Sequence, residues 1–421
     1  MSSSSEKISG LSYLAIDKED VIRTRDLLAQ YLKRDELHRF QMEGFLGGGY
    51  NGLTWKVKYE PIEPVAASPG SNPWPTGLKT GERRIILKTT RRAAMNSSDH
   101  EEDEDEYNNS KSDSEYEDNT QNIIEEKMFV RALQWAKHTV TELRPHKDPL
   151  KQTFPGVRPH YMKGEWMYME WLENGTLKKF VDRALDNGVP IPLPNRLLWR
   201  LFMCLIRMCI AMGWPPDMPD GENPQPVSER IQGPPHGGFI HGDLHHENLM
   251  FGEMLVNDPD TEHALTPILK MIDFGSMQQK GPTASVHKAA IANNLYDIGV
   301  MMIEIITLDY STEVVPDGSK DKEFRLDNTQ NVFFITSGGD LLPNEYGVDP
   351  FPSLDKELRD LVCACLAVDE DLRPSLAAVA NRVSQALRLK DEQYYVLQGT
   401  RGESDEEIRN LVYQLILECV F

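Results

Sequence analysis

The sequence predicts an α+β protein with a small β-rich lobe followed by a larger, mainly helical lobe. Short β-prone segments flank a glycine cluster in residues 42–59 and continue in residues 82–90. From about residue 195 the apolar residues recur mostly at helical spacing. The chain has 421 residues, of which 40% are hydrophobic, and this is more than one small core needs.

The predicted β-rich lobe spans residues 42–172 and follows a helical extension, residues 1–41. A helix is expected over residues 17–40, because its apolar residues recur at helical spacing and Asp17 can cap it. Residues 42–59 predict an antiparallel hairpin, and residues 82–90 predict a third strand after a connection rich in Pro and Gly. The apolar residues that define the first helix are Val21, Leu28, Tyr31 and Leu32.

An acidic insertion at residues 96–121 interrupts this lobe. Residues 99–118 hold eleven acids and one Lys, too few apolar groups to offset the entropy of ordering. We therefore expect a disordered insertion, either a spacer or a segment phosphorylated at Ser112 and Ser114. A helix is expected after it, over residues 123–140.

The predicted helical lobe spans residues 173–390. Its most apolar run, LLWRLFMCLIRMCIAMGW, carries Arg200 and Arg207 on one face and predicts a core helix, not a membrane span. ILKMIDFG predicts a buried strand with a polar tip, and residues 297–308 predict a buried helix. Residues 391–421 end in an amphipathic helix that opens with a Ser404–Glu407 capping box. This helix packs on its own lobe or binds a partner.

Charge and cysteine content restrict the class of protein. A net charge of −21 argues against nucleic-acid and anionic-membrane binding, which require clustered cations. Five cysteines, an odd number, are scattered along the chain and predict reduced thiols. The first ten residues lack the apolar core of a signal peptide. These features predict a cytoplasmic or nuclear protein.

Two features of the β-rich lobe suggest phosphate binding. Gly47, Gly49 and Gly52 form G-x-G-x-x-G between two strands, which disfavours a dinucleotide site but lets backbone N–H groups approach phosphate oxygens. A glycine-rich hairpin without a ligand is the alternative. Lys88, at a strand end, can contact phosphate or remain solvated, and Glu126 or the neighbouring Glu125 can pair with it.

Polar residues with catalytic potential cluster in GGFIHGDLHHENLMFG, residues 237–252. Asp243 can accept a proton from a hydroxyl nucleophile, and Asn248 can reach a metal ion together with Asp273. Mg²⁺ prefers such hard oxygen ligands. A zinc site is the rival interpretation for the three histidines, but no Cys or fourth His lies at ligand spacing. These histidines are His241, His245 and His246.

The ordered motifs resemble those of the protein-kinase superfamily over residues 42–385. LGGGYNG is similar to the glycine loop, IILK to the lysine strand, HGDLHHEN to the catalytic loop and IDFG to the metal-binding tip. NLYDIG and LAVDEDLRPSL are similar to later family motifs, and the whole resembles divergent kinase-like proteins of filamentous fungi. The resemblance implies a bilobal protein-kinase-like fold that uses ATP and Mg²⁺ to phosphorylate Ser or Thr hydroxyls of a protein substrate.

The resemblance also implies a role for each matching residue. Asp243 orients the acceptor hydroxyl, Asn248 and Asp273 hold Mg²⁺, and Lys88 tied to Glu126 clamps the α- and β-phosphates. Met169 is similar to the gatekeeper, Glu170 to Leu172 present backbone groups to adenine, and His241 supports the loop. The glycine loop contributes Leu46, Gly47, Gly49, Gly52 and Thr54 to the nucleotide site.

Several positions depart from the family pattern. Gly242 replaces an Arg that receives an activation-loop phosphate, and His245 replaces a catalytic-loop Lys. Ile86 and Thr54 change the adenine pocket, while Asn294 replaces an Asp that holds the catalytic loop. The A-P-E motif, whose Glu pairs with the residue equivalent to Arg373, is missing. These departures leave two alternatives: a pseudokinase that binds without turnover, and a small-molecule phosphotransferase similar to aminoglycoside or choline kinases.

Overall fold

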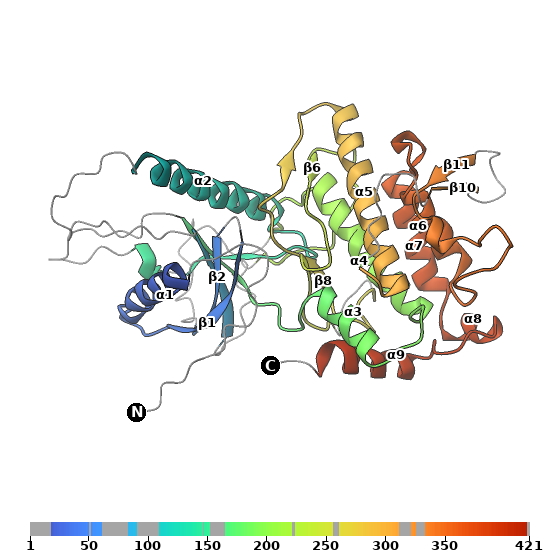
Figure 1. Ribbon diagram of the computed structural model, residues 1–421, viewed down its shortest axis with the longest axis horizontal. Coiled ribbons are helices and arrows are strands. Elements are labelled where there is room, and N and C mark those ends of the chain that lie inside the picture. The colour runs from blue at the N-terminus through green and yellow to red at the C-terminus, as the bar shows by residue number, and fades with distance from the viewer. Residues whose placement is uncertain are drawn as a thin grey trace. The chain divides into compact units, whose positions relative to one another are not determined.

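The described residues of the computed structural model form a mixed α+β protein with two compact units (Figure 1). The structure describes residues 18–49, 52–60, 83–90, 109–145, 147–151, 165–220, 224–255, 261–310, 321–325 and 333–418. The first unit comprises residues up to Gln134, Val140–Trp171 and Met218–Pro226. The second comprises Trp135–Thr139, Leu172–Asp217 and the residues from Val227 onward.

The first unit is built on a five-stranded antiparallel sheet with strand order β1-β2-β3-β5-β4. The predicted hairpin is confirmed as β1 and β2, and the predicted third strand as β3. The strands are β1 (Phe40–Gly49), β2 (Gly52–Tyr59), β3 (Arg83–Thr89), β4 (Glu142–Leu143) and β5 (Trp166–Glu170).

Helix α1 (Lys18–Lys33) packs on one face of this sheet and confirms that a helix is present, but the predicted extension to residue 40 is wrong: the helix ends at Lys33, and β1 begins at Phe40. Leu28 and Leu32 of α1 share a buried cluster with Trp55 of β2 and Leu87 of β3. Because side chains alternate along a strand, Thr54 and Lys88 lie on the opposite face of the sheet from this cluster. One face thus packs on α1, and the other carries Lys88 and Thr54 among apolar side chains such as Met167.

Helix α2 (Asn109–Leu133) differs from the expectation at both ends. The backbone of residues 109–121 is helical, where the sequence predicts disorder, since an established helix adds further residues at little cost. Residues 96–108 and the side chains of Ser112 and Ser114 lie outside the described residues. The helix ends at Leu133, and the predicted continuation to residue 140 is wrong: Ala136 and Thr139 instead form isolated bridges to other segments.

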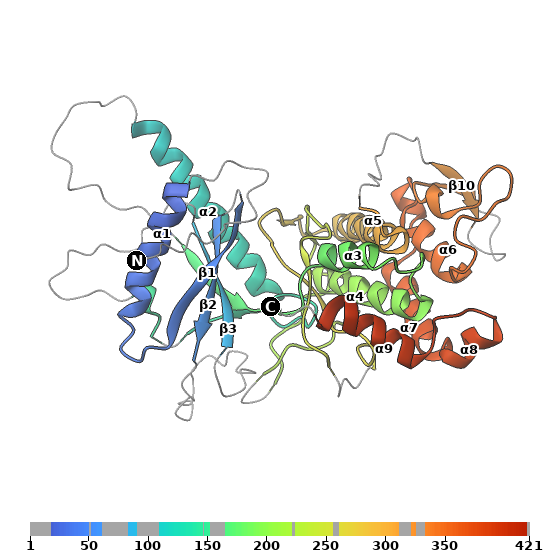
Figure 2. The ribbon, with the colours of Figure 1, turned by 60° about the horizontal axis from the view of Figure 1, so that its bottom comes forward.

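The second unit is mainly helical and centres on α4 (Asn195–Gly213) and α5 (Ala284–Thr307), which lie side by side in Figures 1 and 2. Almost all of α4 is buried, which confirms a core helix. Helix α5 is long and apolar enough to cross a membrane by length and composition alone, yet 67% of its most apolar window is buried in the protein. Cys204, Cys209, Cys363 and Cys365 are free and buried.

Two short antiparallel strand pairs of the second unit frame the predicted catalytic loop. β6 (Phe239–Ile240) pairs with β9 (Gln278–Gln279), and β7 (Leu249–Phe251) pairs with β8 (Leu269–Met271). The loop of residues 241–248 therefore connects β6 to β7, and the IDFG tip follows β8. The remaining elements are α3 (Leu177–Asp186), β10 (Lys322–Arg325), β11 (Phe333–Thr336), α6 (Lys356–Cys365), α7 (Leu376–Leu389) and α8 (Glu392–Leu397), with short 3₁₀ turns at Pro149–Lys151, Gly339–Leu341 and Glu370–Leu372.

The C-terminal helix α9 (Asp405–Val412) continues into a π-helical turn, η4 (Tyr413–Leu417). The Ser404–Glu407 capping box is present. Ile408, Val412, Leu415 and Ile416 of the apolar stripe are buried within the second unit, and Leu411 is partly buried. The buried Glu403 carboxylate accepts hydrogen bonds from the first backbone N–H groups of α4, where a negative charge is favourable. The apolar stripe therefore packs on its own unit.

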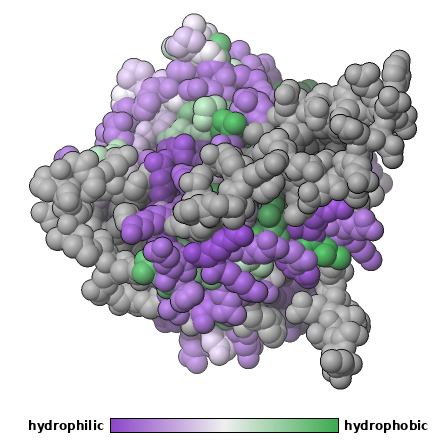
Figure 3. Space-filling view, turned by 90° about the vertical axis from the view of Figure 1, so that its left-hand side faces the viewer, coloured by the Kyte–Doolittle hydropathy of each residue, from purple (hydrophilic) through white to green (hydrophobic). Residues whose placement is uncertain are grey.

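The described surface of the face in Figure 3 is mostly hydrophilic, with small hydrophobic areas scattered over it. Single exposed apolar groups of this kind are normal on a protein surface.

Candidate phosphotransfer site

In the first unit, Lys88 and Glu126 form a buried ion pair. The Lys88 Nζ lies 2.7 Å from the Glu126 Oε1, and the two side chains are 8% and 1% exposed. Strand β3 fixes Lys88 beside Thr54 of β2 and Met167 of β5, and α2 supplies Glu126. Glu125 is exposed and accepts a hydrogen bond from Gln121 instead. The structure therefore selects Glu126 from the two acids that the sequence leaves open.

The three predicted loop glycines differ in why they are glycine. Gly52 has φ +147°, and a Cβ there would lie 2.2 Å from the Thr89 carbonyl oxygen, so local packing alone requires glycine. A Cβ on Gly47 would meet no described atom within 4 Å. Gly49 pairs with Gly52 across the hairpin, whose tip lies outside the described residues. Of the two glycines whose surroundings the structure describes, Gly47 is therefore the one with open space at its Cβ position.

The predicted adenine-binding segment runs across the boundary between the units. Met169 on β5 pairs with Ile86 and with Glu142, on the sheet face that also carries Lys88 and Thr54. The Glu170 carboxylate accepts a hydrogen bond of 2.8 Å from the Thr141 N–H, so this side chain fixes the end of β5. Glu170 and Leu46 belong to the first unit, and Leu172 is a buried residue of the second.

In the second unit, Asn248 holds Asp243. The Asn248 Nδ2 donates to the Asp243 carbonyl at 2.9 Å and lies 3.3 Å from its Oδ2. The Asp243 side chain is 53% exposed, whereas Asn248 is 7% exposed. Because the amide nitrogen faces Asp243, the amide oxygen is the atom of Asn248 that can contact a cation. The structure thus brings together two predicted site residues that are five positions apart.

His241 and Asn294 fix the backbone of this loop through hydrogen bonds. The buried His241 accepts a hydrogen bond at Nδ1 from the Asp243 N–H, and its Nε2 donates to the Ile272 carbonyl. This pattern requires a neutral ring, and burial lowers the pKa of His241 accordingly. The Asn294 amide accepts from the His241 N–H and donates to the Phe239 carbonyl. An amide in place of the expected Asp therefore still fixes the backbone.

The other two histidines point to different partners. The His245 Nε2 lies 3.6 Å from the Asp243 Oδ2, and its Nδ1 accepts from the Glu247 N–H. The His246 Nδ1 lies 3.0 Å from the Glu304 carboxylate. With His241 committed to the loop backbone, these three histidines do not gather around one point, which weakens the rival zinc interpretation.

Asp273 follows β8 in a left-handed backbone conformation, with φ +56°. Such a conformation is uncommon for a residue with a side chain, and it gathers at functional sites. The carboxylate Oδ1 accepts a hydrogen bond from the Gly275 N–H at 3.3 Å. Phe274 is fully buried next to the His241 ring, so the aromatic neighbour anchors the turn that presents Asp273.

An open pocket of about 420 Å³ adjoins Asp243. Gly242 on its wall has φ +76°, and a Cβ there would lie 2.6 Å from the Ser276 carbonyl oxygen, which explains glycine in place of the expected Arg. Arg373, whose expected partner is the Glu of the missing A-P-E motif, instead donates hydrogen bonds to the Ala292 and Ala367 carbonyls. The pocket is lined by Ile240, Gly242, Asp243, Leu244, Asn293, Tyr296, Asp297 and Arg373.

Sequence reasoning missed Asp297 and a buried cluster of His138, Cys204 and His263. Burial raises the pKa of Asp297 to about 6, although Arg373 counteracts it. The three cluster residues come from distant segments, so no spacing motif could have indicated them. Comparison of the sequence with protein-family models gives no match, and comparison with curated proteins gives none either.

Proposed function

We propose that this protein is an ATP- and Mg²⁺-dependent phosphotransferase with a protein-kinase-like fold, which transfers a phosphoryl group to a Ser or Thr hydroxyl. The observation that carries the proposal is the loop of residues 241–248. It holds Asp243 rigidly through Asn248 and His241 while it leaves the carboxylate 53% exposed. A positioned, accessible carboxylate is what general-base chemistry on a hydroxyl requires.

In this reaction the oxygen of the acceptor hydroxyl attacks the terminal phosphorus of ATP, and ADP leaves. Asp243 accepts the proton that this hydroxyl loses. Such transfer depends on positioning and on charge neutralisation. His245, 3.6 Å from the Asp243 carboxylate, would contact a phosphoryl oxygen near the attacking hydroxyl. Its ring is shorter than the Lys usual at this position.

The residues present suit a magnesium ion. The Asp273 carboxylate and the Asn248 amide offer the hard oxygens that Mg²⁺ takes in combination with phosphate and water. The hydrogen bond from the Gly275 N–H holds the Asp273 carboxylate, and those to Asp243 hold the Asn248 amide, independently of a ligand. When bound, Mg²⁺ would neutralise charge on the phosphates and stabilise the leaving group.

The Lys88–Glu126 pair supports the same proposal in the first unit. A buried ion pair contributes little net stability compared with apolar residues of similar size, so its presence favours a functional role. Lys88 would contact the α- and β-phosphates, with Glu126 fixing the position of its ammonium. Gly47, with open space at its Cβ position, would let backbone N–H groups approach the phosphates.

The pocket beside Asp243 favours a second candidate, a small-molecule phosphotransferase. Its volume of about 420 Å³ lies in the range of small-ligand sites, and Asn293, Asp297 and Arg373 offer polar contacts. A pseudokinase remains the third reading, in which nucleotide binds without turnover.

Labelled ATP with Mg²⁺, offered together with a mixed protein substrate or a panel of hydroxyl metabolites, tests the three readings. We expect Asp243→Asn to lower transfer at least ~100-fold, the usual contribution of a general base. Glu247→Gln, an exposed acid in the same loop, is the matched control and should transfer at the wild-type rate. Transfer only to metabolites would select the second candidate, and the absence of any Asp243-dependent transfer would exclude both enzymes.

A further inference from the structure

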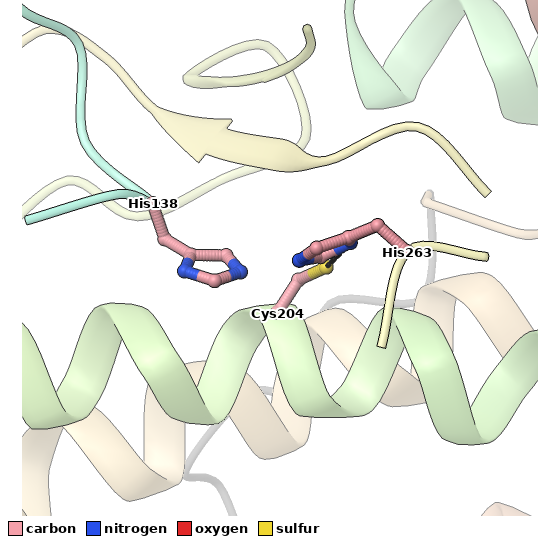
Figure 4. Close-up of side chains that lie close together, drawn as sticks. All are labelled: His138, Cys204 and His263. Atoms are coloured by element: carbon pink, nitrogen blue, oxygen red, sulfur yellow. Dashed lines mark hydrogen bonds between the residues drawn. The ribbon is translucent and has the colours of Figure 1, made fainter. Parts of the chain in front are cut away.

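A second cluster of chemically active side chains lies in the core of the second unit. His138 follows the end of α2, Cys204 lies on α4, and His263 lies in the loop before β8 (Figure 4). All three are at most 1% exposed, and one ligand atom from each lies within 4.8 Å of the others. We propose that His138, Cys204 and His263 bind a Zn²⁺ ion.

The spacing of the donor atoms is close to that of a zinc site. Tetrahedral zinc, with bonds of about 2.3 Å to sulfur and 2.0–2.1 Å to nitrogen, places neighbouring ligand atoms about 3.3–3.6 Å apart. The Cys204 Sγ lies 3.9 Å from the His263 Nδ1. This pair therefore needs to contract by only a few tenths of an ångström. The other pairs, whose ligand atoms lie within 4.8 Å of each other, need to contract by at most about 1.5 Å, which side-chain rotation can supply.

Glu229 orients His138 toward the cluster. The Glu229 Oε2 lies 2.8 Å from the His138 Nδ1, and the Oε1 accepts the His138 backbone N–H at 2.7 Å. The other ring nitrogen, Nε2, is buried and faces the Cys204 sulfur in Figure 4, where the two groups can share a hydrogen bond when no metal is bound. A carboxylate behind a histidine is the usual support of a zinc ligand, because it fixes the tautomer and raises basicity.

The charges balance when the metal is present. Zn²⁺, a Cys204 thiolate and the Glu229 carboxylate sum to zero, which makes burial of the group feasible. Zinc would displace the thiol proton of Cys204 when it binds, because the thiolate is the form that ligates the metal.

The charge around the cluster is partly neutralised. Arg207 lies near His263 and forms an ion pair with the Glu262 carboxylate, which lowers the positive charge that a bound cation would meet. No fourth His, Cys, Asp or Glu joins the group within the described ranges, which leaves the fourth position to water.

The ion would join three separate segments of the second unit. The His138 carbonyl also accepts the backbone N–H of Met271 on β8, the strand that leads to Asp273. Zinc at this cluster would therefore brace the strand that presents Asp273. This inference goes beyond phosphotransfer, and it stands even if the chain has no kinase activity.

Metal analysis of untagged protein purified without chelators tests the proposal, because a histidine tag would bind zinc itself. We expect one zinc per chain in the wild type and in Cys209→Ala, a buried cysteine of the same helix outside the cluster. Cys204→Ala and His263→Gln should lose zinc, and Glu229→Gln should weaken binding 10–100-fold. Zinc retained equally in Cys204→Ala would overturn the proposal.

A second measurement needs no variant and therefore does not depend on how variants fold. X-ray absorption at the zinc edge of the wild type should show one sulfur and two imidazole nitrogens. Cobalt substituted for zinc should give a thiolate-to-metal charge-transfer band. A wild-type protein that holds copper instead, or that binds neither zinc nor cobalt, would refute the assignment and leave a hydrogen-bonded cluster.

Discussion

Three variants of the Lys88–Glu126 pair can measure its effect on the free energy of unfolding separately from its effect on phosphoryl transfer. We consider Lys88→Met, Glu126→Met and the double variant, in which two flexible apolar side chains replace the two charges. Methionine is close to both residues in length, so it fills a similar volume and adapts to irregular gaps.

The burial of the pair sets the expected magnitude. With Glu126 only 1% exposed, Lys88→Met leaves a carboxylate in the interior without its ammonium. Breaking a buried pair on one side costs about 3–5 kcal/mol of unfolding free energy, and Glu126→Met should cost a similar amount. The double variant leaves no unpaired charge, so we expect its stability within about 1 kcal/mol of wild type. The coupling free energy, the sum of the two single losses less that of the double variant, is then at least ~5 kcal/mol.

Urea unfolding at pH 7 without nucleotide measures these stabilities. Because the chain has two units, hydrogen exchange of β3 and α2 should assign the affected transition to the first unit. Phosphoryl transfer, assayed alongside, should be lost in all three variants. The double variant would thus be stable but inactive.

Two results would refute this reasoning. If the double variant is as unstable as the sum of the single variants, the pair is not an interacting unit. If the stable double variant still transfers phosphate at the wild-type rate, Lys88 does not act on the nucleotide.

Three further predictions follow from local geometry. Gly52→Ala should destabilise the first unit by at least ~2 kcal/mol in urea unfolding, because its Cβ would meet the Thr89 carbonyl at 2.2 Å, whereas Gly47→Ala should fold normally and raise the KM for ATP. Asp297→Asn should stabilise the second unit by up to ~3 kcal/mol at pH 8. The pKa of Asp297 in the folded state is about 6, so the wild type loses stability as the pH rises from about 4 through 6 and this carboxylate ionises. Equal stabilities of the two proteins at pH 8 would contradict this. Gly242→Arg should unfold the second unit at lower urea, and a variant as stable as wild type would show that the backbone there adapts.

Spacing of apolar residues predicted an element correctly where that element packs one apolar face against the core. The spacing of Leu28 and Leu32 predicted α1 correctly, because that spacing is what allows a helix to pack on a sheet. The choice between Glu125 and Glu126 was beyond the sequence, since the rotation of α2 about its axis is set by packing. The start of α2 at Asn109 was missed because an acidic composition indicates only that a segment can bury little apolar surface. It does not show that a neighbouring helix can extend into the segment at a small free-energy cost.

The sequence also did not show which distant segments lie close together in the fold. Asn248 and Asp243 are five residues apart in one loop, so their contact could be expected from spacing. His138, Cys204 and His263 meet only because β8 and α4 pack together behind the segment that follows α2. A search for short ligand spacings finds the first kind of site and misses the second.

The departures from the kinase pattern are better explained by local adjustment than by loss of the site. Gly242 occupies a backbone position where a carbonyl of the segment after Asp273 approaches too closely for any Cβ. Arg373, without an acidic partner from an A-P-E motif, binds backbone carbonyls. Both changes concern the side where a protein substrate and an activation-loop phosphate would be received. Lys88 with Glu126 and Asn248 with Asp243 keep their mutual hydrogen bonds. Under the proposed function, these changes would therefore alter the acceptor or the regulation and leave the transfer centre in place.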